Sequence, residues 1–459
     1  MKVGNLVAFA CLTAVCGVAV ADGGKYEATW ESLNARPCPQ WWRDAKFGIF
    51  IHWGVYSVPA FAPTESACIY DCYAEHYWRF LDRDKKPAFI EYQKRHYPGR
   101  SYEDLAPLFT AENFNPEQWA DLFRRAGAKY VVLTSKHHDG FALWPSAFSP
   151  RWNAGVLGPK RDLCGELTAA VRKAGLRMGM YYSLLEWFHP LYNDANIERF
   201  VKEMNHPQMK ELVQTYKPDI LWTDGEWNYK WEIHRGPEFL AWLYNESDVR
   251  DHVVVNDRWG RKFNGKCGDF HTTEYDVVYE GDVSGVGAAH PWEECRGIGH
   301  SFGYNRFERA EDYMTDVQCI ETLCEKVSRG GNFLLNIGPD ATGLIPPIME
   351  DRLLAMGRWL SVNGEAIYGT VAWENRPKDM KKDRVYFTRK GDALYAIFFN
   401  WPQKTLRISN AGTAKTVTFL GSNAKVQFVQ EGEDVLIEPP AITPGTMPCE
   451  HAWTFRLDR

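Results

Sequence analysis

Between about residues 45 and 340, short apolar runs alternate with amphipathic stretches. The apolar runs are rich in Val, Ile and Leu, which is typical of strands that are covered on both faces. Six runs predict strands: KFGIFIHWG (46–54), KYVVLTSKHH (129–138), LRMGMYYSL (176–184), DILWTDG (219–225), HVVVND (252–257) and NFLLNIG (332–338). This part of the chain is therefore expected to form a buried parallel sheet.

The stretches between these runs have the spacing of amphipathic helices. Residues 115–128, NPEQWADLFRRAGA, place their apolar side chains on one face, with Pro116 near the start and Gly127 at the end. Residues 161–176 repeat the pattern. Strand–helix alternation over this length predicts an α/β fold of the (β/α)8-like barrel kind. A doubly wound sheet is the alternative, but no glycine-rich phosphate loop follows the first strand.

The pattern changes after about residue 370. Short alternating segments with tight turns occupy residues 384–400, 415–422, 425–440 and 451–459. Such segments are typical of an antiparallel β-sandwich. We therefore expect a barrel domain over residues 22–365, followed by a C-terminal antiparallel β-sandwich over residues 366–459.

Residues 1–21 have the pattern of a secretory signal peptide. Lys2 precedes an apolar run over residues 6–20, and an A-V-A sequence stands directly before Asp22. A membrane span is the alternative, but the run is short and is interrupted by a threonine and a glycine. We expect an exported chain without a membrane span, located in the medium, a periplasm or a lysosome.

The composition narrows the classes of partner. Hydrophobic residues make up 45% of the chain, which argues against disorder. The formal net charge is −6 and no run of Lys or Arg stands out, so nucleic acid is not an expected partner. The sequence makes no prediction of the oligomeric state.

Polar and aromatic side chains gather where the predicted strands end. The successive ends read HWG, HHDG, YYS followed by EW, WTDG and NDRWG, and a further segment, DFHTTEYD (269–276), supplies Asp269 and Glu274. The active site of a (β/α)8 barrel lies at the carboxyl ends of its strands. Polar residues recur at the ends of successive predicted strands, and this recurrence predicts a catalytic pocket there.

One strand end, DILWTDGEW (219–227), carries two acids. Trp222, Asp224 and Glu226 share one face of an extended strand, so alternation alone does not choose between the acids. Asp224 directly precedes Gly225, where the strand is expected to break. Position therefore favours Asp224, and Glu226 is expected to have a supporting role.

Two kinds of reaction use such residues. Glycoside hydrolysis needs two carboxyl groups with polar and aromatic side chains around the sugar, and its histidines would donate hydrogen bonds to hydroxyl groups. A metal hydrolase would use His52, His137, His138 and an acid as ligands. Neighbours on an extended strand point to opposite faces, so His137 and His138 would share an ion only if the strand bends. We expect no metal and no cofactor.

Several long segments carry a resemblance to a known family: WWRDAKFGIFIHWGVYSVPAF, AGAKYVVLTSKHHDGFALWPS, YYSLLEWFHPLY, KPDILWTDGEW, VVVNDRWG, SFGYNR, GGNFLLNIGPDATGLI and RLLAMGRWLSVNGEAIYG. Together they resemble glycoside hydrolase family 29, the α-L-fucosidases, over nearly the whole mature chain. YYSLLEWFHPLY and VVVNDRWG are especially similar to the animal lysosomal-type enzymes. The resemblance implies a catalytic barrel, a C-terminal β-sandwich, and exo-acting, cofactor-free removal of terminal α-L-fucose from glycans with retention.

The resemblance also implies catalytic roles. The family nucleophile is the Asp of the W-x-D-G motif, which is Asp224 here. Arg258 is our candidate for holding the pKa of Asp224 down. A D-F-x-T-x-E-Y pattern points to Glu274 as the acid/base, and Glu293 in HPWEEC is the alternative.

Sugar contacts are implied in the same way. The residues that match the family's substrate-binding positions are His52, Glu75, His137, His138, Tyr181, Trp222 and Arg258. The chain departs from the family at His76, where a tryptophan usually follows the acid of Glu75. This departure changes the expected aromatic wall of the pocket, so we count His76 among the substrate-binding residues.

Two alternatives to a fucosidase stay open at this point. One is a fucose-binding protein that has kept the pocket and lost turnover. The other is a retaining hydrolase of a related galacto-configured sugar. The presence of Asp224 together with Glu274 or Glu293 argues against the binding protein.

Overall fold

The computed structural model describes residues 25–66, 68–276 and 290–459. The predicted signal peptide, residues 1–21, lies outside the described residues. Within the described ranges, no helix combines the length and apolar character that a membrane crossing requires.

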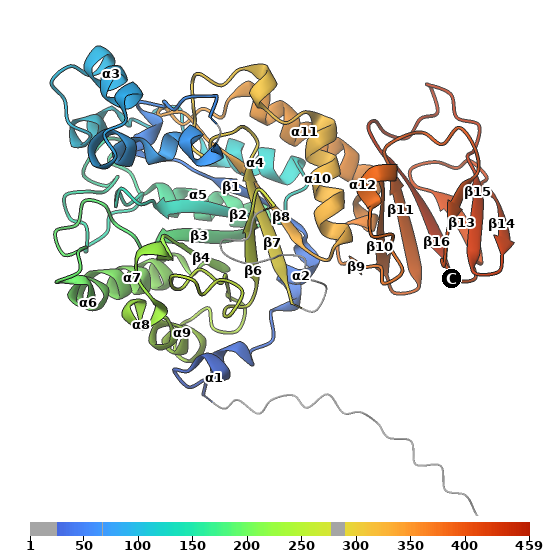
Figure 1. The fold of residues 1–459 in the computed structure, drawn as a ribbon, viewed down its shortest axis with the longest axis horizontal. Coiled ribbons are helices and arrows are strands. Elements are labelled where there is room, and N and C mark those ends of the chain that lie inside the picture. The colour runs from blue at the N-terminus through green and yellow to red at the C-terminus, as the bar shows by residue number, and fades with distance from the viewer. Residues whose placement is uncertain (1–24, 67, 277–289) are drawn as a thin grey trace, which may run out of the picture.

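Eight parallel strands form one curled sheet in the order β5-β4-β3-β2-β1-β8-β7-β6 (Figure 1). Their bounds are β1 Phe47–Ile51, β2 Tyr130–Lys136, β3 Arg177–Ser183, β4 Ile220–Asp224, β5 Val254–Val255, β6 His271–Glu274, β7 Trp292–Gly297 and β8 Asn332–Ile337. The predicted (β/α)8-like barrel is therefore confirmed, with β1 at the centre of the sheet and β5 and β6 at its two ends.

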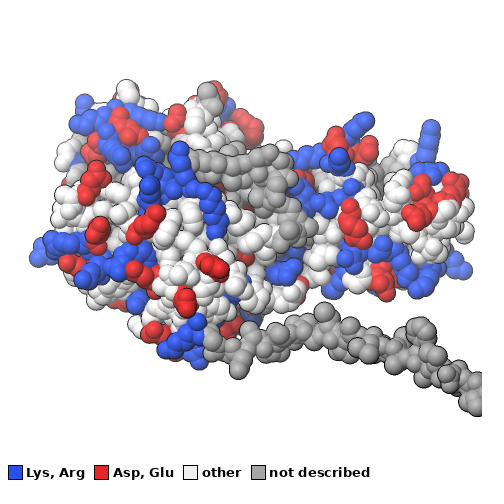
Figure 2. All heavy atoms as spheres, turned by 60° about the horizontal axis from the view of Figure 1, so that its bottom comes forward, with Lys and Arg blue, Asp and Glu red and all other residues white. Residues whose placement is uncertain are grey.

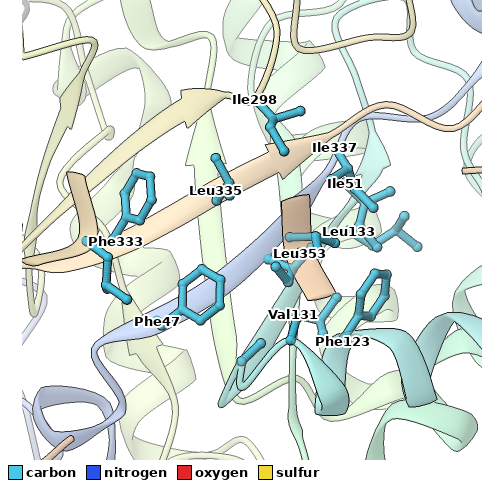
Figure 3. Packing of buried hydrophobic residues seen from close by; sticks show 14 of the residues in the cluster. Phe47, Ile51, Phe123, Val131, Leu133, Ile298, Phe333, Leu335, Ile337 and Leu353 are labelled. Carbon is cyan, nitrogen blue, oxygen red and sulfur yellow. The ribbon is translucent and has the colours of Figure 1, made fainter. Parts of the chain in front are cut away.

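Side chains along each strand alternate between the inside and the outside of the barrel. On β1, Phe47, Ile49 and Ile51 belong to the outer core, whereas Phe50 packs in the interior with Trp222. Figure 3 shows the outer core beside β1, β2 and β8, where the rings of Phe47 and Phe333 lie 6.4 Å apart. Both faces are apolar, which explains why the strands read as nearly continuous hydrophobic runs.

Most helices lie outside the barrel sheet, whereas α12 lies against the C-terminal part of the chain (Figure 1). Their bounds are α1 Trp30–Asn34, α2 Gln40–Ala45, α3 Pro87–His96, α4 Pro116–Arg125, α5 Leu163–Lys173, α6 Ile197–Phe200, α7 His206–Tyr216, α8 Trp231–His234, α9 Gly236–Asn245, α10 Asp316–Ser328, α11 Pro347–Asn363 and α12 Met380–Asp383. The helices predicted in 115–128 and 161–176 are α4 and α5. Each begins at a capping side chain, because Asn115 accepts from Gln118 N at 3.1 Å and Asp162 accepts from Gly165 N at 2.9 Å.

A seam separates β5 from β6, which share no ladder in the described sheet. Two carboxylates cross it: Asp257 accepts hydrogen bonds from Thr272 N and Oγ1, at 3.0 and 2.7 Å, and Asp269 accepts from Val255 N at 2.9 Å. The carbonyl of Val255 accepts from Asp269 N at 2.9 Å. Side chains thus replace most of the missing ladder and bring the two ends of the sheet together.

Strand β7 was not predicted. Its sequence, WEECRG, carries three charged residues, which obscured the apolar run expected of a buried strand. Glu293 and Glu294 are nevertheless buried, and Arg296 pairs with Glu294 at 2.5 Å. Internal pairing and hydrogen bonding satisfy these charges and allow them on a covered strand.

The C-terminal part forms two antiparallel sheets, as the alternating segments predicted. One has the order β13-β16-β11-β10-β9 and the other β12-β15-β14. The bounds are β9 Val371–Ala372, β10 Val385–Lys390, β11 Ala393–Phe398, β12 Leu406–Ile408, β13 Thr416–Phe419, β14 Gln427–Glu431, β15 Asp434–Glu438 and β16 Trp453–Asp458. The five-stranded sheet packs beside α10 and α11 (Figure 1). There Arg384 forms a bidentate pair with Glu321 at 2.9 and 2.6 Å.

Charged side chains are mixed on the surface. Figure 2 shows Lys and Arg interspersed with Asp and Glu over the face that it displays. The displayed face therefore presents both signs of charge.

Candidate active site

A cavity of about 230 Å³ opens at the carboxyl ends of the barrel strands. Its lining includes these residues singled out from the sequence: His52, Glu75, His76, His137, His138, Tyr181, Trp222, Asp224, Arg258 and Glu274. Glu293 does not line it. Side chains from separate parts of the sequence therefore meet in one pocket.

Asp224 stands at the last position of β4. Gly225 follows with φ 75°, a left-handed conformation that glycine adopts without strain. A Cβ atom on Gly225 would lie 2.6 Å from Leu185 Cβ, so this turn also needs the small residue for space. The strand ends where the sequence predicted, and the turn leaves the Asp224 carboxylate at the cavity.

Two side chains hold the Asp224 carboxylate. Arg258 donates from Nη1 to Oδ1 at 2.8 Å, and the Tyr181 hydroxyl donates to Oδ2 at 2.8 Å. Burial by itself raises the pKa of Asp224, but the positive charge of Arg258 and these hydrogen bonds outweigh it and hold the pKa below its ordinary value. Asp224 is therefore ionised near neutral pH.

Glu274 ends strand β6 and reaches the same guanidinium. Arg258 Nη2 donates to Glu274 Oε2 at 3.2 Å, and the Tyr73 hydroxyl donates to Oε1 at 2.8 Å. Burial raises the pKa of Glu274, Arg258 opposes this, and the charge of Asp224 adds to the rise, so the net shift is upward. The two acids thus differ in proton affinity, with Asp224 the stronger acid.

Glu293 lies beneath the pocket. It accepts hydrogen bonds from the Tyr130 hydroxyl and, at 3.1 Å, from Trp222 Nε1. Burial raises its pKa to about 7. Because Trp222 itself lines the cavity, Glu293 supports the floor and does not face the Asp224 carboxylate from inside the pocket.

Glu226 begins the short helical turn Glu226–Asn228 and is buried outside the cavity lining. Its Oε1 accepts from Asn264 Nδ2 at 3.2 Å, and burial raises its pKa to about 8. Glu226 therefore lies next to the cavity and outside its lining, and its supporting role stays a prediction.

His137 and His138 both line the cavity, although they are neighbours in sequence. Strand β2 ends at Lys136 after a shift of register between Thr134 and Lys136, so the two histidines are not on an extended strand. Their ring centroids lie 4.1 Å apart. The exception stated for a bent strand therefore applies, because the chain leaves the extended strand just before them.

Hydrogen bonds fix the tautomers of two cavity histidines. Asn336 Nδ2 donates to Phe302 O, so Asn336 Oδ1 accepts from His52 Nδ1 at 2.6 Å. Ser183 Oγ donates to Leu185 O and therefore accepts from His138 Nδ1 at 2.6 Å.

Burial lowers the pKa of His52 to about 3 and of His138 to about 4. Both rings are therefore neutral and protonated at Nδ1. Each presents Nε2 as an acceptor for a hydroxyl group, whereas the sequence argument had assigned these histidines as donors.

Glu75 and His76 come from the short turn Ala74–His76. Gly303 N and Ser301 Oγ donate to Glu75 Oε2 at 2.8 and 3.1 Å, and burial raises the pKa of Glu75 to about 8. His76 lies with its ring centroid 5.6 Å from that of Trp187. An indole therefore lies next to His76, where the resemblance had led us to expect a tryptophan.

Several lining residues were not predicted: Phe50, Tyr70, Tyr73, Arg79, Trp227, Cys295 and Phe302. Tyr70, Tyr73 and Arg79 come from the segment after β1, whose irregular sequence carries no periodicity. Asp269, which the strand-end pattern had grouped with the pocket, instead pairs with Arg36 at 2.7 Å and closes the seam.

Comparisons with known proteins show the family to which the chain belongs. The family model described as α-L-fucosidase matches residues 14–365, and the model described as α-L-fucosidase C-terminal domain matches residues 377–458. The chain is 44% identical to tissue α-L-fucosidase of Rattus norvegicus, covering 99% of this chain and 97% of that protein. It is 43% identical to tissue α-L-fucosidase of Homo sapiens, covering 94% and 92% respectively.

Solved structures are similar as well. Thermotoga maritima α-fucosidase in complex with fucose has a TM-score of 0.78 and 36% identity, covering 94% of this chain and 100% of that one. An α-L-fucosidase trapped as a covalent intermediate, from Bacteroides thetaiotaomicron, has a TM-score of 0.75 and 25% identity, covering 91% and 95%.

Proposed function

The chain belongs to the α-L-fucosidase family and is an enzyme of that activity, and we propose that it hydrolyses terminal α-L-fucosides by double displacement with retention. One observation carries the mechanism. Asp224 and Glu274 are two buried carboxyl groups in one cavity, and both accept a hydrogen bond from the guanidinium of Arg258. Their pKa values shift in opposite directions. A retaining glycosidase needs such a pair, an ionised nucleophile and a protonated acid.

In the first step Asp224 attacks the anomeric carbon. A bond forms between its carboxylate oxygen and that carbon while the glycosidic bond breaks, and Glu274 gives its proton to the leaving oxygen. In the second step Glu274 takes a proton from water. The water oxygen then bonds to the anomeric carbon and releases Asp224 as a carboxylate.

Arg258 keeps Asp224 ionised before attack. It also lies near both carboxyl groups. Its positive charge therefore does not have to move when Asp224 loses its negative charge and Glu274 gains one. Nothing in this sequence of steps needs a metal or a cofactor.

The cavity supports removal of single terminal sugars. A volume of about 230 Å³ lies below the range of drug-sized pockets, about 300–1,000 Å³, and fits one monosaccharide. The acceptor nitrogens of His52 and His138 and the charged groups around Asp224 favour a ligand rich in hydroxyl groups. Terminal fucose on glycans or glycoconjugates is the substrate class that we assign.

Azide rescue tests the two roles. In Asp224→Ala, activity on an aryl fucoside is expected to vanish, and azide is expected to restore it with a β-configured fucosyl azide. In Glu274→Ala, azide is expected to give the α-configured product, because it attacks the covalent intermediate. Glu293→Ala serves as the matched control without rescue. Rescue of Glu293→Ala but not of Glu274→Ala would exchange the two roles.

A parallel assay separates the alternatives. Release of aryl fucoside with no release of aryl galactoside supports the assignment, and preference for galactoside would favour the related sugar. No release from either would favour a fucose-binding protein. The names of the relatives, tissue and plasma α-L-fucosidases, support our further proposal that the mature chain acts in a lysosome or outside the cell.

A further inference from the structure

Three imidazoles converge at one side of the cavity. His76, His137 and His138 are all buried, and one ring nitrogen from each lies within 4.8 Å of the others. His76 comes from the turn Ala74–His76, and the other two follow β2. Separate segments of the barrel rim thus build the cluster.

The nitrogens of this cluster are available. His76 Nδ1 and His137 Nδ1 are buried and have no hydrogen-bond partner among the described residues. His138 Nδ1 is bonded to Ser183, which leaves Nε2 as the acceptor. A buried polar nitrogen without a partner is uncommon and calls for an explanation.

A carboxylate oxygen, which is a further acceptor atom, also lies close to this cluster. His138 Nε2 lies 3.6 Å from Asp224 Oδ2. With His138 protonated at Nδ1, these two atoms are both acceptors, so neither satisfies the other. A cation bound near both atoms would satisfy His138 Nε2, and the Asp224 carboxylate, whose Oδ2 already accepts from the Tyr181 hydroxyl, would contribute charge to such a site.

We propose that His76, His137 and His138 bind a divalent transition-metal ion of the Zn²⁺ type, which inhibits the enzyme by occupying the sugar pocket. Neutral imidazole suits such ions, with Zn–N distances of about 2.0–2.1 Å. The rings must approach by about 1 Å from their present spacing to meet that distance. The bond from His138 Nδ1 to Ser183 supplies the outer contact that metal-bound histidines usually make.

His76 supplies the third nitrogen of this cluster, from a segment separate from the one that carries His137 and His138. The ion has no part in the proposed hydrolysis. It competes with fucose because His137, His138 and Asp224 line the pocket that the sugar needs.

Calorimetry on the full mature chain tests binding directly. Titration with Zn²⁺ is expected to show one site that excess L-fucose suppresses. Zn²⁺ is also expected to raise KM for an aryl fucoside without changing kcat, and a chelator is expected to reverse the effect. Zinc binding that fucose leaves unchanged, or inhibition that lowers kcat alone, would overturn the proposal.

Unpaired cysteines are the main competing ligands, since the described residues include nine. Co²⁺ absorption separates the two ligand types, because thiolate ligation adds an intense charge-transfer band that imidazole ligation lacks. The expected spectrum is that of a nitrogen-rich site without this band. A fucose-sensitive site that shows the thiolate band would contradict the assignment.

Variants of His76 provide the residue-level test. His76→Trp and His76→Gln are each expected to weaken the fucose-sensitive Zn²⁺ site by about 100-fold or more, since even an outer-shell partner contributes 10–100-fold. His96→Gln, at an exposed histidine on α3, is the matched control and should bind as the parent does. Retained affinity in both folded His76 variants would refute the proposal. Because binding is measured without turnover, this result stands apart from the test of the fucosidase mechanism.

Discussion

Asp224 and Glu274 share a single cation: Arg258 donates one hydrogen bond to each, at 2.8 and 3.2 Å. The cation stabilises the ionised form of both acids, yet their pKa values shift in opposite directions. The shorter contact and the Tyr181 hydroxyl favour ionisation of Asp224, whose charge then disfavours ionisation of Glu274. One arginine therefore helps to set the division of roles between the two acids.

Replacement of Arg258 by lysine tests this division. Arg258→Lys keeps the charge but loses the planar fork that reaches both carboxyl groups. We expect kcat/KM to fall by about 100-fold or more, as for loss of one preorganised donor. The acidic limb of the pH profile should move to higher pH, because Asp224 loses part of the interaction that lowers its pKa. An unchanged acidic limb would contradict the role given to Arg258.

The parent enzyme is expected to have a bell-shaped pH profile of kcat/KM. Activity needs Asp224 ionised and Glu274 protonated, so it rises through the lowered pKa of Asp224 and falls through the raised pKa of Glu274. Glu274→Gln should abolish the alkaline limb when the substrate is an aryl fucoside with a good leaving group. The profile should then be flat above the acidic limb; persistence of the alkaline limb would assign it to another group.

Glu293 provides a test through stability. Burial raises its pKa to about 7 in the folded state, above the ordinary value of 4.5. The folded state then binds more protons than the unfolded state between these values, so the unfolding free energy falls as pH rises from about 4.5 to about 7. Gln resembles the protonated acid and should remove this loss. The Tm of Glu293→Gln should match the parent at pH 5 and exceed it at pH 8.

Glu112→Gln is the control for that experiment, because Glu112 is exposed. Its Tm relative to the parent should be the same at both pH values. If the Tm difference between Glu293→Gln and the parent were the same at both pH values, the buried carboxyl would not be the source of the pH-dependent stability.

The turn after β4 gives a prediction with a matched control. Gly225 and Gly99 have similar φ values, 75° and 73°, but a Cβ at Gly225 would lie 2.6 Å from Leu185 Cβ, whereas one at Gly99 would meet nothing within 4 Å. Both Ala variants carry the left-handed strain, about 1 kcal/mol. Only Gly225→Ala should also displace Asp224 and lower kcat by about 10-fold or more. Equal kcat in the two variants would refute the positional argument.

Much of the fold follows from local patterning, and its exceptions have physical causes. The six long apolar runs became strands because both faces of the barrel are dry. Strand β7 escaped prediction because Glu293, Glu294 and Arg296 satisfy one another or neighbouring groups inside the protein, which composition alone does not reveal.

The site shows the same division. The position of Asp224 at the end of β4 was predictable from Gly225, since the signal for the end of a strand is local. The separation of Glu274 from Glu293 depends on which side of Trp222 each acid lies, and only the closed barrel fixes that. Tyr73 and Arg79 come from an irregular segment, whose sequence has no periodicity from which their positions could be predicted.

The seam between β5 and β6 gives the barrel an uneven resistance to local opening. Arg258 follows β5 and Glu274 ends β6, so the two residues lie on opposite sides of that seam. Amide protons at Val255 and Thr272 are bonded to side-chain carboxylates and should exchange with solvent before those inside the β1–β2 ladder. Warming would then separate Glu274 from Arg258, while Asp224 stays bonded to Arg258. Activity would therefore be lost before the protein as a whole unfolds.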